Sequence, residues 1–198
     1  MDLTKSLHRL AVALLTLVML VIFNADAAGR TLAGVAFEEQ LHLDGTPLLL
    51  NGAGVRSKFF IKAYTIGLYL PRKVGDAKLA INQPGPKRLR IVALRDVGVS
   101  MFLSGPNNSL EKNCARSDLT ALQPRLDQFN AAIKSIGQIP EGEAFTIDLT
   151  ADNQTRLNLN GKQVGQNIAG VDFYQALLHV WLGEKPAQEE LKAALLGL

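Results

Sequence analysis

Cysteine is almost absent from this chain of 198 residues, and its single cysteine, Cys114, excludes an internal disulfide. We interpret Cys114 as a small buried apolar residue. The lack of a second cysteine also excludes the cysteine pairs of structural zinc sites. The excess of positive over negative charge is also small. A net charge of +3 is too low for a strongly basic nucleic-acid-binding protein. We therefore expect no nucleic-acid partner.

Several enzyme signatures are missing from the sequence. Gly52 and Gly54 lack the third glycine and the following helix of a dinucleotide-binding loop. There is no phosphate-binding loop, no His-Glu-x-x-His motif and no Gly-x-Ser-x-Gly nucleophile turn. His42 and His179 have no adjacent carboxylate in the sequence, so we interpret them as surface or hydrogen-bonded histidines. These absences argue against a hydrolase, a metalloenzyme or a dehydrogenase, and we expect no metal and no cofactor.

The longest hydrophobic run lies near the N-terminus, over residues 10–23. The basic residues Lys5 and Arg9 precede it, and Ala25 and Ala27 follow it in a small-x-small pattern. A basic end, an apolar stretch and a small-residue cleavage site are the successive parts of a secretory signal peptide. The pattern therefore predicts export of the protein, to the periplasm or out of the cell.

This prediction divides the chain into a signal peptide over residues 1–27 and a single domain over residues 28–198. As a helix, the apolar run would span about 21 Å, which is short of the roughly 30 Å hydrocarbon core of a bilayer. An uncleaved N-terminal anchor is the competing interpretation. After cleavage we expect no stable membrane anchor.

Strands are predicted by period-two alternation and by β-branched and aromatic residues. Residues 35–43 alternate with one mismatch, Glu39, and predict a half-buried strand that a turn at residues 44–47 ends. Residues 51–54 are interpreted as a second flexible point. Asn160-Gly161 predicts a tight hairpin turn. Further strands are expected over residues 55–61, 62–70, 89–94, 144–150 and 155–159.

Helices are predicted by apolar residues at spacings of three and four. The clearest runs over residues 119–136, with Ser117 or Asp118 as its N-cap. A helix over residues 100–112 is only weakly indicated, because Gly105 to Asn108 interrupt the segment. Strands, helices, strands and helices then follow one another without a linker, which favours one α+β domain with a mostly antiparallel sheet. The other expected helices cover residues 76–81, 171–182 and 187–196.

Five segments stand out by their order and spacing: Asn51-Gly52-Ala53-Gly54-Val55-Arg56, residues 62–71, residues 160–173, residues 181–186 and residues 191–197. Together they resemble the chalcone isomerase family, and in particular its bacterial exported branch. The resemblance covers nearly all of residues 28–198 and implies the fold of that family: an open-faced β-sandwich, in which helices pack on a curved antiparallel sheet.

The resemblance also implies candidate site residues. In the plant enzymes of the family, an arginine after the Gly-x-Gly turn favours the phenolate of the substrate, and a threonine and a distant tyrosine polarise its ketone through water. Arg56 matches that arginine, whereas Tyr64 stands at the threonine's position. Asn113 corresponds to an asparagine near the substrate, and Val180 lies near the last site position. The distant tyrosine has no counterpart, so one polar group is retained, one replaced and one lost.

Three functions remain open from these residues. The first is binding of a small apolar anion, such as a fatty acid, by Arg56, Tyr64 and Asn113, because non-catalytic members of the family bind fatty acids. The second is an intramolecular lyase that uses Arg56 and Tyr64 as catalytic residues. The third is a non-catalytic periplasmic structural or assembly factor with a filled cleft. The plain alternative is that Arg56 pairs with a surface carboxylate and Tyr64 is a half-buried strand residue; protein partners are not indicated.

Overall fold

A computed structural model describes residues 29–198 except residues 59 and 114–115. The predicted signal peptide and Cys114 therefore lie outside the described residues, and so do the side chains of Ser117 and Asp118, the two candidate N-caps. Across the part that is described, no helix is long and apolar enough to span a bilayer.

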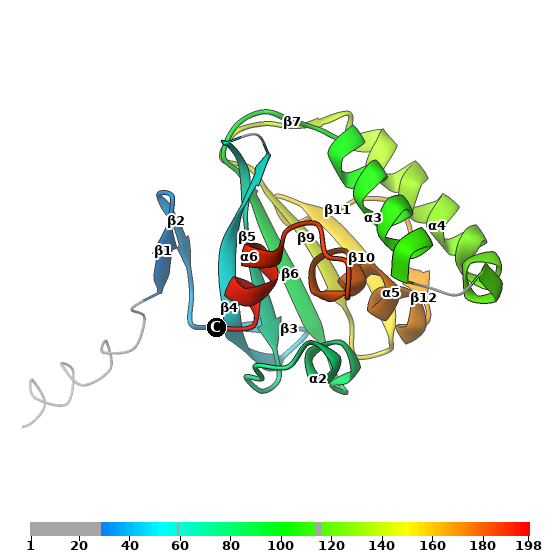
Figure 1. The fold of residues 1–198 in the computed structure, drawn as a ribbon, viewed down its shortest axis with the longest axis horizontal. Coiled ribbons are helices and arrows are strands. Elements are labelled where there is room, and N and C mark those ends of the chain that lie inside the picture. Colours follow the sequence, from blue (N-terminus) through cyan, green and yellow to red (C-terminus); the bar gives the residue numbers. More distant parts are fainter. Residues whose placement is uncertain (1–28, 59, 114–115) are drawn as a thin grey trace, which may run out of the picture.

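The centre of the fold is one antiparallel sheet that curls into a half-barrel (Figure 1). Its strands lie in the order β11-β10-β9-β6-β5-β4-β3, and β12 adds a second pairing to β10. The long hairpin β4–β5 therefore lies next to the central strands. The bounds are β3 Gln40–Leu43, β4 Thr46–Lys58, β5 Ile61–Leu70, β6 Lys87–Ala93, β9 Ala144–Leu149, β10 Gln154–Leu159, β11 Lys162–Gln163 and β12 Ile168–Ala169.

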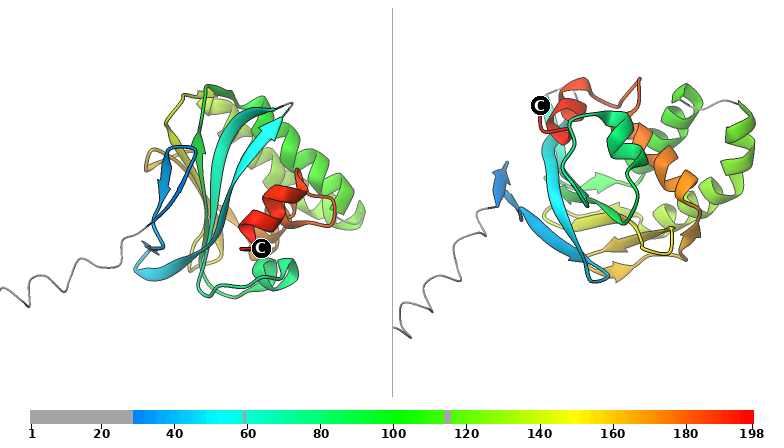
Figure 2. Two further views of the ribbon diagram at one scale, coloured as in Figure 1. Left: turned by 60° about the vertical axis from the view of Figure 1, so that its left-hand side comes forward. Right: turned by 90° about the horizontal axis from the view of Figure 1, so that it is seen from below.

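The helices gather on the concave side of the sheet, and a small N-terminal hairpin lies on the other side (Figures 1 and 2). A helical pair, α3 and α4, is inserted between β6 and β9, which are nevertheless neighbours in the sheet. The bounds are α2 Ala77–Asn82, α3 Ser100–Asn113, α4 Arg116–Ile136, α5 Val171–Leu182 and α6 Glu189–Leu195, with the short strands β1 Arg30–Leu32, β2 Val35–Phe37, β7 Val97–Gly98 and β8 Gln138–Ile139.

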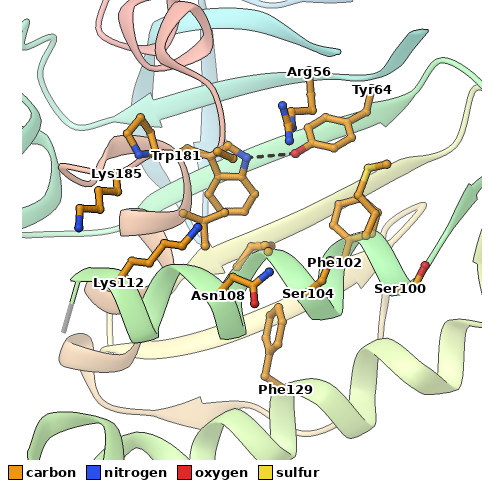
Figure 3. A pocket seen from close by; sticks show the side chains of 16 residues that line it. Arg56, Tyr64, Ser100, Phe102, Ser104, Asn108, Lys112, Phe129, Trp181 and Lys185 are labelled. Carbon is orange, nitrogen blue, oxygen red and sulfur yellow. Dashed lines mark hydrogen bonds between the residues drawn. The ribbon is translucent and has the colours of Figure 1, made fainter. Parts of the chain in front are cut away.

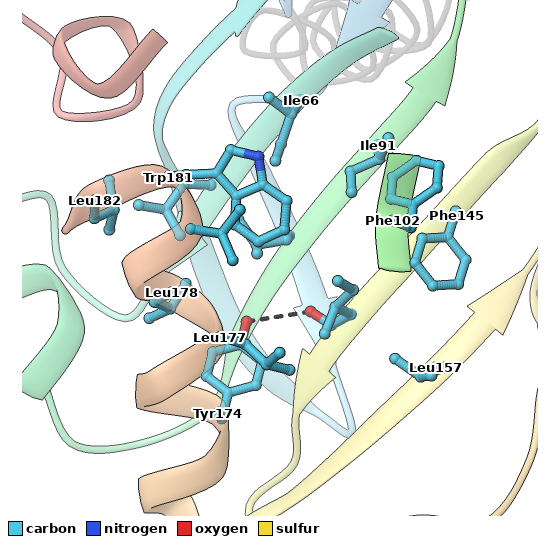
Figure 4. Packing of buried hydrophobic residues seen from close by; sticks show 14 of the residues in the cluster. Ile66, Ile91, Phe102, Phe145, Leu157, Tyr174, Leu177, Leu178, Trp181 and Leu182 are labelled. Carbon is cyan, nitrogen blue, oxygen red and sulfur yellow. Dashed lines mark hydrogen bonds between the residues drawn. The ribbon is translucent and has the colours of Figure 1, made fainter. Parts of the chain in front are cut away.

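Helix α5 fills the concave face of the sheet (Figure 4). Phe173 and Leu178 of this helix are fully buried, as are Ile66 of β5 and Ile147 of β9. The hydroxyl of Tyr174 donates to the backbone oxygen of Ile147 at 3.1 Å, so even the polar atom of this buried tyrosine is satisfied against the sheet. A second, smaller core lies on the other face, under the N-terminal hairpin, and contains Phe37, Leu43, Leu48, Leu50, Ala53 and Tyr69.

The predicted α+β class and the curved antiparallel sheet are confirmed, and most predicted elements form within a few residues of their expected bounds. The hairpin turn at Asn160-Gly161 is confirmed, since both residues have positive φ angles (49° and 77°) between β10 and β11. Positive φ angles at both central residues are what a two-residue turn needs in order to match the right-handed twist of the strands that it joins.

The prediction of one strand over residues 35–43 is wrong, because the strand ends at Phe37 and a new one begins at Gln40. Residues 35–37 pair back onto β1, whereas β3 pairs with β4. The inward positions still alternate as expected, with Phe37 and Leu43 buried. Glu39, the mismatch in the pattern, instead faces Lys73 at 3.2 Å. A carboxylate cannot join the apolar face of a strand without a partner, so the ladder ends there.

Residues 51–54 are not a flexible point either, because they lie buried within β4. A side-chain carbon at Gly52 would come within 2.2 Å of the backbone oxygen of Ala194 in α6. The pairing of β4 with β5 shifts register between Leu50 and Gly52, and the amide of Asn51 donates to the backbone oxygen of Leu195 at 2.7 Å. The glycine therefore serves close packing of a helix end against a bulged strand.

The expected interruption at Gly105 to Asn108 does not occur, because α3 runs unbroken through these residues. The segment includes Pro106, and a proline inside a helix removes one backbone hydrogen bond. Phe102 and Leu110 of α3 are nevertheless buried in the main core. Tertiary packing of these side chains outweighs the local preference, as it commonly does for helices.

The two histidines differ in environment. His42 is exposed on β3, as predicted. His179 on α5 is half-buried, and burial lowers its pKa. Its Nδ1 atom has no hydrogen-bond partner among the described residues, so the prediction that this histidine is at the surface or hydrogen-bonded is not met there.

Because of Lys87, we expect the free energy of unfolding to depend on pH. Its side chain is fully buried and donates to the backbone oxygen of Gln83. Burial lowers its pKa from 10.5 to about 8, so between these values the unfolded chain binds more protons than the folded one, and stability rises with pH. We expect the free energy of unfolding to increase by about 1.5 kcal/mol from about pH 8 to about pH 9.5, measured by urea denaturation.

The matched variant is Lys87→Met, which should lack this increase because it has no proton to lose. The range stays below pH 10 because burial raises the pKa of Tyr69 to about 12. Tyrosines that ionise only in the unfolded chain lower stability at higher pH. An equal change in both proteins would contradict the assignment to Lys87.

Candidate functional site

Arg56 and Tyr64 are brought together by the β4–β5 hairpin, in which they are directly opposite partners. Residues opposite each other in an antiparallel pair project on the same face of the sheet. Both side chains here reach the concave side, where they line one end of a cavity (Figure 3). The pairing of these two candidates thus follows from hairpin register.

The cavity has a volume of about 520 Å³ and lies between the sheet, α3 and the segment that follows α5. Helix α3 forms one wall through Met101, Phe102, Ser104 and Asn108. Its volume is within the range of small-molecule sites, roughly 300–1,000 Å³. The remaining walls include Phe129 of α4, Ile147 of β9, Val180 and Trp181 of α5, and Pro186 and Ala187 of the segment before α6.

The hydroxyl of Tyr64 is fixed by Trp181, whose indole Nε1 donates to it at 3.2 Å. The Tyr64 ring also stacks on Phe102 with ring centroids 5.6 Å apart. An indole N–H can only donate, so the tyrosine oxygen accepts this bond and keeps its own proton as a donor. Burial raises the pKa of Tyr64 against the opposing effects of the Trp181 hydrogen bond and of Arg56, which acts through its charge and a hydrogen bond. The hydroxyl therefore stays protonated at neutral pH.

Arg56 is positioned by Gln188, which lies just before α6. The Oε1 atom of Gln188 accepts from Arg56 Nη1 at 3.2 Å and from the backbone nitrogen of Ser57 at 3.1 Å. Arg56 Nη1 also donates to the backbone oxygen of Ser57 at 3.0 Å. These contacts hold one nitrogen of the guanidinium and leave donors on the others. Among the described residues no carboxylate pairs with Arg56, contrary to the plain alternative.

The charge of the cavity lining is positive. Besides Arg56, the lining includes Lys112 at the end of α3 and Lys185 after α5, both of them exposed. Among the described residues that line the cavity, none is acidic. In Figure 3 the two lysines lie at the opposite end of the cavity from Arg56 and Tyr64. An anion is therefore favoured throughout this space.

Asn113, the third candidate, is not brought to this cavity. It ends α3, and its Oδ1 atom accepts from the backbone nitrogen of Lys185 at 3.2 Å. A side-chain carbon at Gly183 would lie 2.8 Å from the same oxygen. Asn113 thus holds the loop after α5, which carries Lys185 on the cavity's rim. Val180, in contrast, does line the cavity, with no hydroxyl to offer.

The sequence profile of chalcone isomerase-like proteins matches residues 29–197. The chain belongs to the chalcone isomerase-like family. Among solved structures, this chalcone isomerase-like protein is similar to one described as a fatty-acid binding protein of Arabidopsis thaliana, with a TM-score of 0.62 and 17% sequence identity. The similarity covers 85% of this chain and 95% of the plant chain, and it confirms the predicted fold. No curated protein matches the chain at a significant level.

Much of the site of this chalcone isomerase-like protein has no signal in its sequence. The wall formed by Phe102, Ser104 and Asn108 belongs to a helix that was only weakly indicated. Trp181 packs in the core with 3% exposure, but it also lines the cavity and binds Tyr64. Its spacing along α5 shows burial, and nothing in the sequence shows where its indole nitrogen points.

The Trp181–Tyr64 hydrogen bond predicts the effect of removing one hydroxyl. Tyr64→Phe leaves the buried indole N–H without its acceptor, which we expect to lower the free energy of unfolding by about 1–2 kcal/mol. Trp181 is the chain's only tryptophan, so its emission spectrum reports on this contact directly. We expect a changed emission maximum. Tyr69→Phe removes a hydroxyl from the same strand but in the other core, and equal spectra for the two variants would contradict the assignment.

Proposed function

We propose that this protein binds a long-chain fatty acid, with the carboxylate at Arg56 and Tyr64 and the chain along the apolar walls. The observation that carries the proposal is the pairing of these two donors at the end of the cavity, where no carboxylate of the described residues neutralises the guanidinium. A guanidinium and a phenol can donate together to the two oxygens of one carboxylate.

The walls beyond these donors suit an alkyl chain. Met101, Phe102, Phe129, Ile147 and Val180 line the space and offer no hydrogen bond, whereas Ser100, Ser104 and Asn108 add a few polar groups along α3. Methionine and aromatic side chains adapt to chains of different length and curvature. A ligand with one charged end and an apolar body therefore matches the distribution of groups better than a sugar or a nucleotide, which need many donors and acceptors.

The similar Arabidopsis thaliana structure supports the proposal, since that protein is described as a fatty-acid binding protein. The other two functions find less support. The plant enzymes polarise the ketone with a threonine and a distant tyrosine, whereas here Tyr64 is the only tyrosine of the described lining, Tyr174 binds the backbone of β9, and the other hydroxyls are those of Ser100 and Ser104. A purely structural factor was expected to have a filled cleft, whereas side chains leave about 520 Å³ here.

Arg56→Ala tests the carboxylate site. We expect delipidated protein to bind palmitate about tenfold to a hundredfold more weakly after this change, because a charge-assisted hydrogen bond is lost. Quenching or enhancement of Trp181 emission during a palmitate titration gives the dissociation constant. The control is Arg72→Ala, which removes the same charge from an exposed position outside the cavity.

Methyl palmitate separates the head group from the tail in the same titration. It has no carboxylate charge, so Arg56→Ala should change its affinity little. Unaltered palmitate affinity in Arg56→Ala, or a failure of saturating palmitate to bind the wild-type protein, would reject the proposal.

We further propose that the protein acts after export, as a member of the exported bacterial branch of its family. The support is the signal-peptide pattern of residues 1–27. When the full chain is expressed in a Gram-negative host, the periplasmic fraction should contain a protein whose intact mass corresponds to a chain that begins at Ala28. Ala27→Arg should block cleavage, because the site requires a small residue there. Full-length mass in the wild type, or confinement to the cytoplasm, would contradict export.

A further inference from the structure

The tip of the β4–β5 hairpin exposes two successive apolar side chains. Phe60 is fully exposed, and Ile61 is 52% exposed. The other large apolar residues that the described chain exposes (Leu79, Val171 and Leu198) are not adjacent to one another in sequence. In Figures 1 and 2 this tip lies at the end of the longest hairpin of the sheet, away from α2 and the chain's C-terminus.

The backbone at the tip is unusual for such residues. Phe60 has a φ angle of 66°, in the left-handed region that bulky residues rarely adopt. Glycine or asparagine would form this turn at lower cost. A fully exposed phenylalanine in a strained turn gains nothing from water, so its presence points to a partner that the tip contacts.

The residues beside the tip are basic. Lys62 is exposed next to Ile61 and lies opposite Ser57, and Lys58 lies opposite Ile61 in the register of the hairpin. Residues 55–63 include no acidic residue. Apolar residues between basic ones match a lipid surface with anionic head groups, in which the apolar groups enter the interface and the ammonium groups stay among the phosphates.

We propose that this tip docks reversibly on an anionic lipid bilayer, with Phe60 and Ile61 in the interface and Lys62 at the head groups. The contact is a peripheral one, made by two side chains and a few charges. It depends on both parts, because one short apolar contact or a few lysines alone give only marginal binding.

The docking would bring the cavity to the membrane. Arg56 lies two residues before the end of β4, which corresponds to about 7 Å along a strand. A shallow hollow beside the tip is lined by Ile61, Ala63 and Val97, and it shares Ser100 and Met101 with the cavity. An acyl chain could thus pass from the bilayer to the cavity along an apolar surface; this use of the contact rests on the proposed function, whereas the docking itself does not.

The charges of the hollow itself are balanced. Its lining includes Arg95 and Asp96, one of each sign. The carboxylate of Asp96 accepts from the backbone nitrogen of Glu141 at 3.1 Å, which partly satisfies its charge. The sign of the surface that faces the membrane is therefore set by Lys62 of the hairpin.

Vesicle flotation tests the docking. Purified protein should float with vesicles of equal parts phosphatidylcholine and phosphatidylglycerol, less with phosphatidylcholine alone, and less again at high salt, which screens the lysines. The double change Phe60→Ser with Ile61→Ser should reduce partitioning by about tenfold or more, because it removes the inserted apolar area. Lys62→Glu should weaken binding to the anionic vesicles specifically.

Leu79→Ser is the matched control, since Leu79 is 61% exposed on α2. It should float like the wild type. The proposal is overturned if the wild type does not bind the anionic vesicles or if the double variant binds them equally. It is also overturned if sedimentation shows a wild-type dimer that the double variant breaks, because the partner of the tip would then be a second copy.

Palmitate titration of the same variants separates this proposal from the proposed function. The double variant should keep the wild-type palmitate affinity in solution, and Arg56→Ala should keep vesicle binding. If the wild-type protein floats normally with the anionic vesicles but does not bind palmitate, the fatty-acid site is rejected and the docking stays intact.

Discussion

The fold depends on one constraint: the curled sheet must bury an apolar helix in its concave face. Helix α5 meets this need, since Phe173, Leu177 and Leu178 are each at most 1% exposed. A helix that is apolar over most of its surface is stable only when other elements cover it on most sides. The sheet covers one side, and the inserted pair α3–α4, with α2 and α6, covers others. The helical insertion between β6 and β9 is therefore part of the same core.

The site is a consequence of how this helix ends. Trp181 lies in the last turn of α5, where the helix meets the β4–β5 hairpin, and its indole nitrogen meets the Tyr64 hydroxyl. After Trp181 the chain leaves the sheet and returns to it at α6. The cavity lies between this connecting segment and α3. The return to β4 is tight because Gly52 lets α6 approach and Asn51 binds its end. Gln188, at the start of that return, then holds Arg56 in place.

Local rules predicted most of the strands, the Asn160-Gly161 hairpin and helix α5, because each depends on periodicity or turn residues within a few positions. The pairing of Arg56 with Tyr64 depends on the register of the β4–β5 hairpin, which those rules did not predict. The failures have a common physical cause, namely contacts between residues distant in sequence. Residues 51–54 looked flexible because the helix that packs on their glycines lies about 140 residues later. Helix α3 looked broken at Gly105 because burial of Phe102 and Leu110 is not visible in its sequence.

The arrangement of donors favours binding over catalysis. Gln188 and Trp181 fix the two groups that would meet an anion, so little conformational entropy is lost when it binds. A ring-closing enzyme needs, in addition, a group whose interaction grows as charge moves onto the ketone. Val180 faces the cavity near the place where such a group is expected, and the burial that raises the pKa of Tyr64 makes its hydroxyl a poor proton source. Donors that are fixed before a ligand arrives suit the binding of a charged ligand in its ground state.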